Sequence, residues 1–250
     1  MGLPALAHGE PIMNARRRYS PPKVIRETTL TEALAYVGRP PLEQRQMSML
    51  ASDQSKSDSF IFYAGQLDIL RRPAVAIVGA RDVSELGKKR ARRLARELAD
   101  RGVVVVSGLA KGVDVNAHQA AMDAGGFTVA VIGTPLQQAY PAEHASLQEL
   151  IADDHLLISP FADGTRVFQS NFPKRNRVMA ALTDGTVIVQ ASDTSGTLHQ
   201  AAECQRLGRW LFILKSVFDD PSLKWPRSFA SYEKTVIVES TEDVLARLIV

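Results

Sequence analysis

Short apolar runs alternate with helix-like segments along most of the chain, and this alternation constrains the fold more than any other feature. The run at residues 102–108 (GVVVVSG) has four consecutive valines, which predict a strand buried on both faces. Strands that alternate with helices at such short spacing form βαβ units with right-handed crossovers. We therefore predict an α/β protein with a doubly wound, mostly parallel sheet and helices on both faces.

The predicted elements begin near residue 74. In the helix at 84–101 we expect Leu86, Ala91 and Leu94 to face the core with Ala95 and Leu98, and its basic residues to form a solvated face. The expected strands are 74–80, 102–108, 127–133, 155–160, 185–191 and 209–214, with a seventh at 235–239. The other expected helices are 113–124, 143–152, 172–182, 196–207 and a closing one at 242–250.

The first 58 residues differ in composition and predict a short N-terminal extension, with the main domain at 59–250. Residues 1–28 mix Pro, Gly, Arg and Ser without periodicity, so we expect them to be disordered or loosely draped over the domain. A short helix is expected at 29–37, where Thr29 and Glu32 fit a capping box. Residues 38–58 are an expected linker, and 60–63 (FIFY) an expected strand.

Charge and composition narrow the kinds of function. The chain carries 30 basic and 27 acidic residues, and the whole excess lies in the first 72, so an anion site has to come from local clustering. No apolar run approaches the ~20 residues of a membrane span, and no secretory signal is apparent. Cys204 is the only cysteine, which we interpret as a packing residue in a cytoplasmic protein. The histidines show no metal-ligand spacing, so no metal is expected.

The loops that follow the first two strands contain glycines and cations. Ligands of doubly wound sheets bind at the carboxyl ends of the parallel strands, here called the carboxyl edge. After Gly79 the dinucleotide fingerprint requires a second glycine where Arg81 stands, so an NAD or FAD site is not expected. Arg81 is either a phosphate ligand or a solvated loop residue. In the next loop, Ser107, Gly108, Lys111 and Gly112 could form an anion nest.

Two residues after that nest have open roles. Asp114 fits best as the cap of the helix that begins there, with a functional role as the alternative. His118 lies one turn later, so we expect an Asp114–His118 contact. The sequence alone favours neither a structural nor a functional role for His118.

The loops that follow the fourth and fifth strands complete the candidate site. The stretch N-F-P-K-R-N-R places Lys174, Arg175, Asn176 and Arg177 around a helix N-terminus. Cations there oppose the helix dipole, which is easier to explain if they hold a phosphate. Phe172 either stacks on a base or belongs to the core. At the next helix Ser195, Gly196 and Thr197 could bind a phosphate or merely cap the helix.

These motifs, in this order, resemble the DNA-processing protein A family, also called DprA or Smf. The matching stretches, between about residues 59 and 214, are VAIVGAR, VVSGLAKGVDVNAH, TVAVIGTPLQQAYPAEH, NFPKRNRVMAALTD and SGTLHQA. The resemblance implies an extended Rossmann-like domain, commonly a homodimer, that binds single-stranded DNA. It further implies a role in natural transformation and recombination through loading of the RecA recombinase, with no cofactor. The residues implied to face DNA are Gly79, Arg81, Ser107, Gly108, Lys111, Gly112, Lys174, Arg175, Asn176 and Arg177, with Ser195, Gly196 and Thr197 nearby.

The sequence also departs from the family pattern. Pro160 and Gln190 stand where family members usually have glutamate, which changes the charge near the candidate site. A C-terminal winged helix, present in many members, is not expected here. The alternative hypothesis is a nucleotide-binding sensor or a nucleotide N-glycoside hydrolase of the lysine-decarboxylase-like superfamily. Against hydrolysis, Gln200 occupies the position of that family's glutamate, so no catalytic acid–base residue is identified and we predict a binding protein. A third alternative is a domain that holds only a structural anion.

Overall fold

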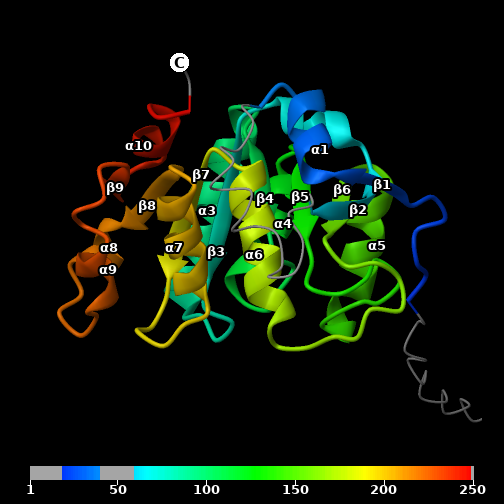
Figure 1. Ribbon diagram of the computed structural model, residues 1–250. Coiled ribbons are helices and arrows are strands. Elements are labelled where there is room, and N and C mark those ends of the chain that lie inside the picture. Colours follow the sequence, from blue (N-terminus) through cyan, green and yellow to red (C-terminus); the bar gives the residue numbers. More distant parts are fainter. Residues whose placement is uncertain (1–18, 40–58, 249–250) are drawn as a thin grey trace, which may run out of the picture.

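One β-sheet runs through the middle of the molecule, with helices on both sides (Figure 1). The computed structural model describes residues 19–39 and 59–248. In this part of the chain the sheet has nine strands in the order β1-β2-β6-β5-β4-β3-β7-β8-β9, and only the β1–β2 and β2–β6 pairs are antiparallel. The predicted doubly wound, mostly parallel sheet is therefore confirmed. The strands are β1 (Arg26–Thr29), β2 (Phe60–Gly65), β3 (Ala74–Gly79), β4 (Val104–Ser107), β5 (Thr128–Val131), β6 (Leu156–Ser159), β7 (Gly185–Gln190), β8 (Trp210–Leu214) and β9 (Thr235–Val238).

Helices cover both faces of the sheet, as the continuous apolar strands require. On one face α1, α6 and α7 share a core with the sheet; on the other lie α3, α4, α5 and α10 (Figure 1). The short elements η1, α8 and α9 were not predicted from the sequence. The helices are α1 (Leu30–Tyr36), η1 (Leu67–Arg71), α3 (Glu85–Asp100), α4 (Val113–Asp123), η2 (Ala142–His144), α5 (Ala145–Asp154), α6 (Asn171–Leu182), α7 (Thr197–Arg206), α8 (Lys215–Phe218), α9 (Trp225–Ser228) and α10 (Thr241–Leu245).

The predicted burial of the valine run on both faces of the sheet is confirmed. Val104 and Val106 belong to the core on the α6 side, and Val103 and Val105 to the core on the α3 side. Successive side chains of a strand point to opposite faces, so an unbroken valine run fits only a strand that is covered twice.

Helix α3 differs from the prediction in one inward position. Leu86 is 56% exposed, and Gly87 is buried in its place. The buried residues Gly87, Ala91, Leu94, Ala95 and Leu98 follow helical spacing, and Leu86 lies about 100° away from that stripe. The rest of the predicted stripe is confirmed. The basic face is solvated as expected, with exposed ion pairs such as Arg93–Glu97.

Residues 19–39 pack against the main sheet. The predicted helix is present as α1, and the Thr29–Glu32 capping box is formed. The predicted disorder is wrong for the described residues that precede it, because β1 pairs with β2 and the Tyr19 hydroxyl donates to Leu136 O at 2.7 Å. Residues 1–18 and 40–58 lie outside the described residues, and with them most of the predicted linker.

The strand order creates a switch point beside β3. The chain runs from β3 through β4 and β5 to β6 on one side, and then returns to β7 on the other side of β3. The loops after β3 and β7 therefore leave in opposite directions and open a crevice at the carboxyl edge. Ligands of doubly wound folds bind at this position.

Candidate functional site

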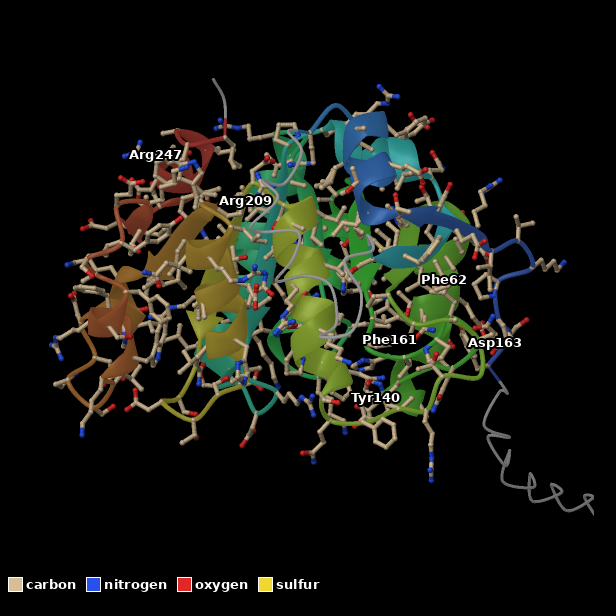
Figure 2. All side chains as sticks on the ribbon, in the orientation of Figure 1. Phe62, Tyr140, Phe161, Asp163, Arg209 and Arg247 are labelled. Atoms are coloured by element: carbon tan, nitrogen blue, oxygen red, sulfur yellow. The ribbon has the colours of Figure 1, made fainter. Side chains whose placement is uncertain are left out.

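A cavity of about 990 Å³ lies at the switch point. The ends of β3 and β7 form its floor at Gly79 and Gln190, while the first turns of α6 and α7 contribute walls. Figure 2 shows Tyr140, which lines the cavity, at the lower edge of the molecule beneath α6. A smaller cavity of about 60 Å³ shares Arg81, Tyr140, Phe172 and Arg175 with it.

The structure brings nine of the thirteen predicted site residues to these cavities and leaves four away from them. The large cavity is lined by Gly79, Arg81, Arg175, Asn176, Ser195, Gly196 and Thr197, and the small one adds Gly108 and Lys111. The four residues that line neither cavity are Ser107, Gly112, Lys174 and Arg177.

Arg175 is a buried cation in the wall of both cavities. Only 6% of the residue is exposed, and its Nη1 donates to Val131 O at 2.5 Å. Its guanidinium lies directly against Gly108, where a Cβ would be 1.8 Å from Nη1. Within the described residues Nε has no hydrogen-bond partner. Burial lowers the pKa of Arg175 while the Asp114 carboxylate opposes that shift, and an arginine so shifted is still charged near pH 7.

Asp114 holds the β4–α4 loop and does not cap the helix as predicted. The N-cap of α4 is Gly112, and the buried Asp114 carboxylate accepts from Gly108 N (3.1 Å) and Ala110 N (3.3 Å). Burial raises the pKa of Asp114, and the nearby Arg175 counteracts this shift. The carboxylate therefore fixes the backbone of the loop against which the Arg175 side chain lies.

The predicted contact between Asp114 and His118 is wrong, because both side chains bond elsewhere. His118 Nδ1 lies 2.7 Å from Thr128 Oγ1, and that hydroxyl donates its proton to Val105 O. Nδ1 must therefore donate to the hydroxyl, which places the bare nitrogen of the neutral ring at Nε2. Burial lowers the pKa of His118 to about 3, so the ring is neutral near pH 7. His118 thus has a structural role.

Two aromatic rings and an arginine line the junction of the cavities. Phe172 and Tyr140 have ring centroids 5.6 Å apart, and the Arg81 guanidinium carbon lies 5.5 Å from the Phe172 centroid. Phe172 also packs on Gly133, where a Cβ would be 2.8 Å from the ring. The two sequence interpretations of Phe172 therefore combine, since the ring packs on one side and lines the cavity on the other.

Two of the predicted loop residues have structural roles. The Ser107 hydroxyl is buried and donates to Ile77 O at 2.6 Å. Gly112 has φ +79°, and a Cβ there would lie 2.3 Å from Ala80 O, so it holds the β4–α4 loop against the β3–α3 loop. Lys111 is exposed and forms an ion pair with Glu143 at 3.0 Å.

The FPKRNR cluster is divided by the helix that contains it. Helix α6 begins at Asn171, so Lys174 is in the first turn, whereas Arg175 and Arg177 lie beyond it, where the dipole effect is weak. Because successive helical residues are rotated by about 100°, Arg175 points to a different side of the helix from Lys174 and Arg177, which are only about 60° apart. Lys174 is exposed, Arg175 is buried at the cavity, and Arg177 Nε donates to Glu203 Oε1 of α7 at 3.2 Å.

The wall on the α7 side combines hydroxyl and amide groups. The Ser195 hydroxyl accepts from Thr197 N at 3.2 Å, but the N-cap of α7 is Gly196 and no side chain caps the helix, so the capping interpretation is not confirmed. The buried Gln200 donates through Nε2 to Thr186 Oγ1 at 3.1 Å. Sequence reasoning identified no binding role for the remaining lining residues, which include Tyr140, Gln169, Ser170 and His199. All of these residues lie in or just after a loop at the carboxyl edge, and this position is the one feature of the sequence that could have identified them.

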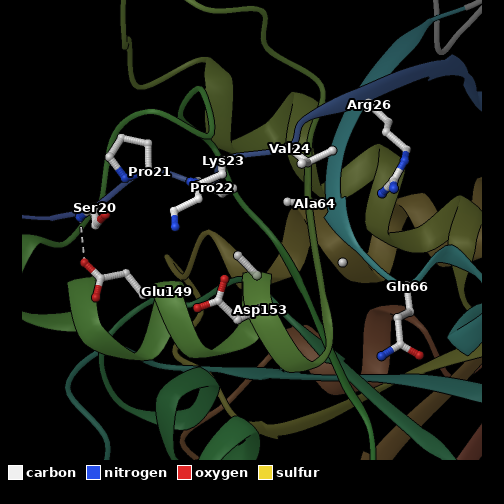
Figure 3. Close-up of a pocket in the computed structure, with 12 residues that line it drawn as sticks. Ser20, Pro21, Pro22, Lys23, Val24, Arg26, Ala64, Gln66, Glu149 and Asp153 are labelled. Carbon is white, nitrogen blue, oxygen red and sulfur yellow. Dashed lines mark hydrogen bonds between the residues drawn. The ribbon is translucent and has the colours of Figure 1, made fainter.

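Another cavity, of about 440 Å³ and separate from the two above, lies between residues 20–26 and α5 (Figure 3). The backbone N–H of Ser20 donates to Glu149 Oε1 at 2.6 Å and fixes one end of it. Its lining includes Lys23 and Arg26 as well as Glu149 and Asp153, so the charges are of both signs. None of the predicted site residues lines it.

Two kinds of site were searched for in the described residues. No cluster of three or more His, Cys, Asp or Glu side chains there has the arrangement of metal ligands. None of the helices in the same ranges combines the length and the apolar composition that crossing a lipid bilayer requires.

Comparison with known proteins gives consistent matches. The model of the family DNA recombination-mediator protein A matches residues 42–248. DNA processing protein DprA of Streptococcus pneumoniae is 39% identical over 186 residues, which are 74% of this chain and 65% of that protein. Protein Smf of Escherichia coli is 33% identical over 189 residues, or 75% of this chain and 50% of that protein. The chain thus spans half to about two thirds of these relatives.

Solved structures show the same fold. A DNA processing protein A from Streptococcus pneumoniae superposes with a TM-score of 0.74 at 32% identity, covering 91% of this chain and 76% of that one. DNA processing protein A of Helicobacter pylori, studied for its single-stranded DNA binding mode, gives a TM-score of 0.68 at 27% identity, covering 78% and 90%.

Proposed function

Because the chain belongs to the DNA recombination-mediator protein A family, we propose that it binds single-stranded DNA in the cavity at the carboxyl edge. Binding is through the sugar-phosphate backbone and is independent of base sequence. The single-stranded DNA binding mode of the Helicobacter pylori relative supports this choice of ligand.

One observation carries the proposal, namely the buried cation Arg175, which lines both cavities. A buried cation is stable only when its charge and donors are satisfied. Val131 O and Asp114 satisfy part of this requirement. A phosphate in the cavity would supply a second negative charge beside the guanidinium, and Arg81 is an exposed cation beside the same position.

The shape and chemistry of the site favour a single strand over a duplex. Tyr140 and Phe172 present aromatic surface to the cavity, and only the unpaired bases of a single strand can stack on such rings. The cavity is also a local hollow at the sheet edge, which a flexible strand can enter.

Fluorescence anisotropy with labelled single-stranded and duplex oligonucleotides, between about 50 and 200 mM salt, tests this proposal. We expect the single strand to bind more tightly than the duplex. In a plot of log binding constant against log salt concentration, the negative slope should become less steep by about 0.7 for Arg81→Ala, the value for one phosphate contact. Arg93→Ala, on an exposed part of α3 that lines neither site cavity, is the control and leaves the slope unchanged. Equal affinity for duplex and single strand would contradict the proposal.

We propose a binding protein and not an enzyme. Gln200, at the position of the glutamate in the related hydrolases, is buried and tied to Thr186, and Asp114 is occupied by two backbone N–H groups. Neither is therefore free to act as an acid–base residue toward a ligand in the cavity. Incubation with nucleoside monophosphates should release no free base above the buffer control.

The wider biology is proposed by analogy with the family. We propose that the protein acts in the cytoplasm as a homodimer, loads RecA on single strands in transformation and recombination, and needs no cofactor. We further propose residues 59–250 as the DNA-binding domain, to which β1 and α1 add an edge strand and a helix. Light scattering gives the oligomeric state. RecA filament assembly on strands coated with this protein tests the RecA step.

A further inference from the structure

The loop between β6 and α6 holds an exposed aromatic ring that no motif explained. Phe168 is 55% exposed, among the most exposed large apolar side chains in the described residues. The guanidinium carbon of Arg166 lies 5.9 Å from the centre of this ring. Sequence reasoning assigned a role to neither residue. An aromatic ring with an arginine beside it is the combination that binds unpaired bases.

Hydrogen bonds from Asn171 fix the backbone of this loop. The side chain of the buried Asn171 donates to Gly133 O (3.3 Å) and to Arg166 O (3.4 Å). Its backbone N–H donates to Phe168 O at 3.0 Å. Because both Arg166 and Phe168 are tied at their carbonyls, the exposed ring lies on a fixed stretch of chain.

The ring lies beside the cavity that we assign to the DNA backbone. The two residues that follow it, Gln169 and Ser170, line that cavity. Phe168 precedes Phe172 by four residues, so their Cα atoms are at most ~14 Å apart. Figure 2 shows the loop leaving the region of Asp163 and running along the lower edge of the molecule toward the start of α6.

We propose that Phe168, with Arg166 beside it, is a stacking site for one unpaired base of the strand whose backbone lies in the cavity. This inference rests on the proposed function and adds a base contact outside the cavity. A base that covers the ring removes its apolar face from water. Arg166 then supplies a positive charge next to the same nucleotide. The contact is independent of base identity, since every base has a π-face.

Phe168→Ala measures the contribution of the ring. We expect affinity for a normal single strand to fall about 5- to 150-fold, the range for loss of one base–aromatic stack. Phe168→Trp keeps the stack and should retain wild-type affinity. Phe60→Ala is the matched control, because Phe60 is 54% exposed and lines neither site cavity. Its affinity should equal that of the wild type.

A strand of equal length built from abasic residues separates stacking from loop support. If the ring stacks on a base, Phe168→Ala and the wild type bind the abasic strand equally. An equal loss on normal and abasic strands would mean that the ring only supports the loop, and would overturn the inference, as would unchanged affinity for the normal strand. If the wild type itself fails to bind single strands, the proposed function fails instead.

Discussion

Replacement of Gly108 by alanine is the most direct test of the buried arginine. The added Cβ would lie 1.8 Å from Arg175 Nη1 and 2.4 Å from its Cζ, so the buried guanidinium has to move away from the loop. Overpacking of this kind costs about 1–3 kcal/mol. Displacement of the guanidinium also removes its bond to Val131 O, worth about 1.5–3 kcal/mol for a charged donor. We expect Gly108→Ala to destabilise the protein by roughly 2.5–6 kcal/mol.

Urea unfolding and thermal melting measure this cost. For a chain of this size the expected loss lowers the melting temperature by roughly 5–24 °C. Single-stranded DNA affinity should fall as well, because the displaced guanidinium no longer holds its charge at the same place in the cavity wall. Gly196→Ala is the control: it also lines the cavity, but no atom lies within 4 Å of its added Cβ, so stability should change by less than about 1 kcal/mol.

A double-mutant cycle assigns the cost to the arginine. Arg175→Lys keeps the charge but removes the planar fork that the methyl group of the Gly108→Ala variant would meet. If the collision with the guanidinium is the cause, Gly108→Ala costs less in the Arg175→Lys background than in the wild type. The same cost in both backgrounds would refute the reasoning and place the strain in the β4–α4 loop itself.

Three further predictions concern residues away from the cavity wall. Arg177→Ala should leave single-stranded DNA affinity within about two-fold of wild type in anisotropy titrations, because Arg177 binds Glu203 and lines neither cavity; a loss as large as that of a cavity arginine would contradict this. The pKa of His118 is about 3, below its unfolded value, so the native state binds fewer protons and stability falls as pH drops from about 6.5 toward 3, by up to about 1.4 kcal/mol per pH unit. His118→Asn should flatten this slope in urea unfolding at pH 7 to 4, and an unchanged slope would assign it to other groups. Arg39→Ala breaks a largely buried ion pair with Asp184 and should cost about 3–5 kcal/mol in the same assay, whereas a cost below about 1 kcal/mol would place the pair among weak surface contacts.

Local pattern was enough to predict the sheet and the edge at which the candidate site lies. Strand runs such as 102–108 are continuous and apolar because both faces are covered, and that signal does not depend on distant residues. The prediction that Arg81, Gly108 and Arg175 meet follows from parallel strands whose carboxyl ends share one edge. Their binding of DNA remains a prediction.

The direction of each side chain could not be read from the same pattern. Lys174, Arg175 and Arg177 look equivalent in sequence, and only the rotation of α6 separates an exposed, a buried and an α7-bound cation. The Ser107 hydroxyl was assigned to an anion nest, but a carbonyl 30 residues earlier in the chain takes its proton. The prediction that Leu86 faces the core is wrong for a related reason, because the buried side of the first turn of α3 begins one residue later than predicted. Each miss depends on a contact between residues that are distant in the chain or on an exact helical phase.

The buried Asp114–Arg175 arrangement favours a ligand site over a purely structural role. A buried ion pair is commonly no more stable than a well-packed apolar pair, so stability alone is a weak reason for it. Here the carboxylate is directed at two loop N–H groups, and the Arg175 residue lines both cavities. Both groups are fixed before a ligand arrives, so binding avoids the cost of about 0.5–1.5 kcal/mol for ordering a long side chain. The exposed cations Arg81 and Lys174 cannot provide such a fixed donor, but they extend the positive field that attracts an anionic strand toward it. The site therefore combines a buried cation in the cavity wall with exposed cations nearby, which predicts that loss of Arg175 mainly speeds dissociation whereas loss of Arg81 or Lys174 mainly slows association.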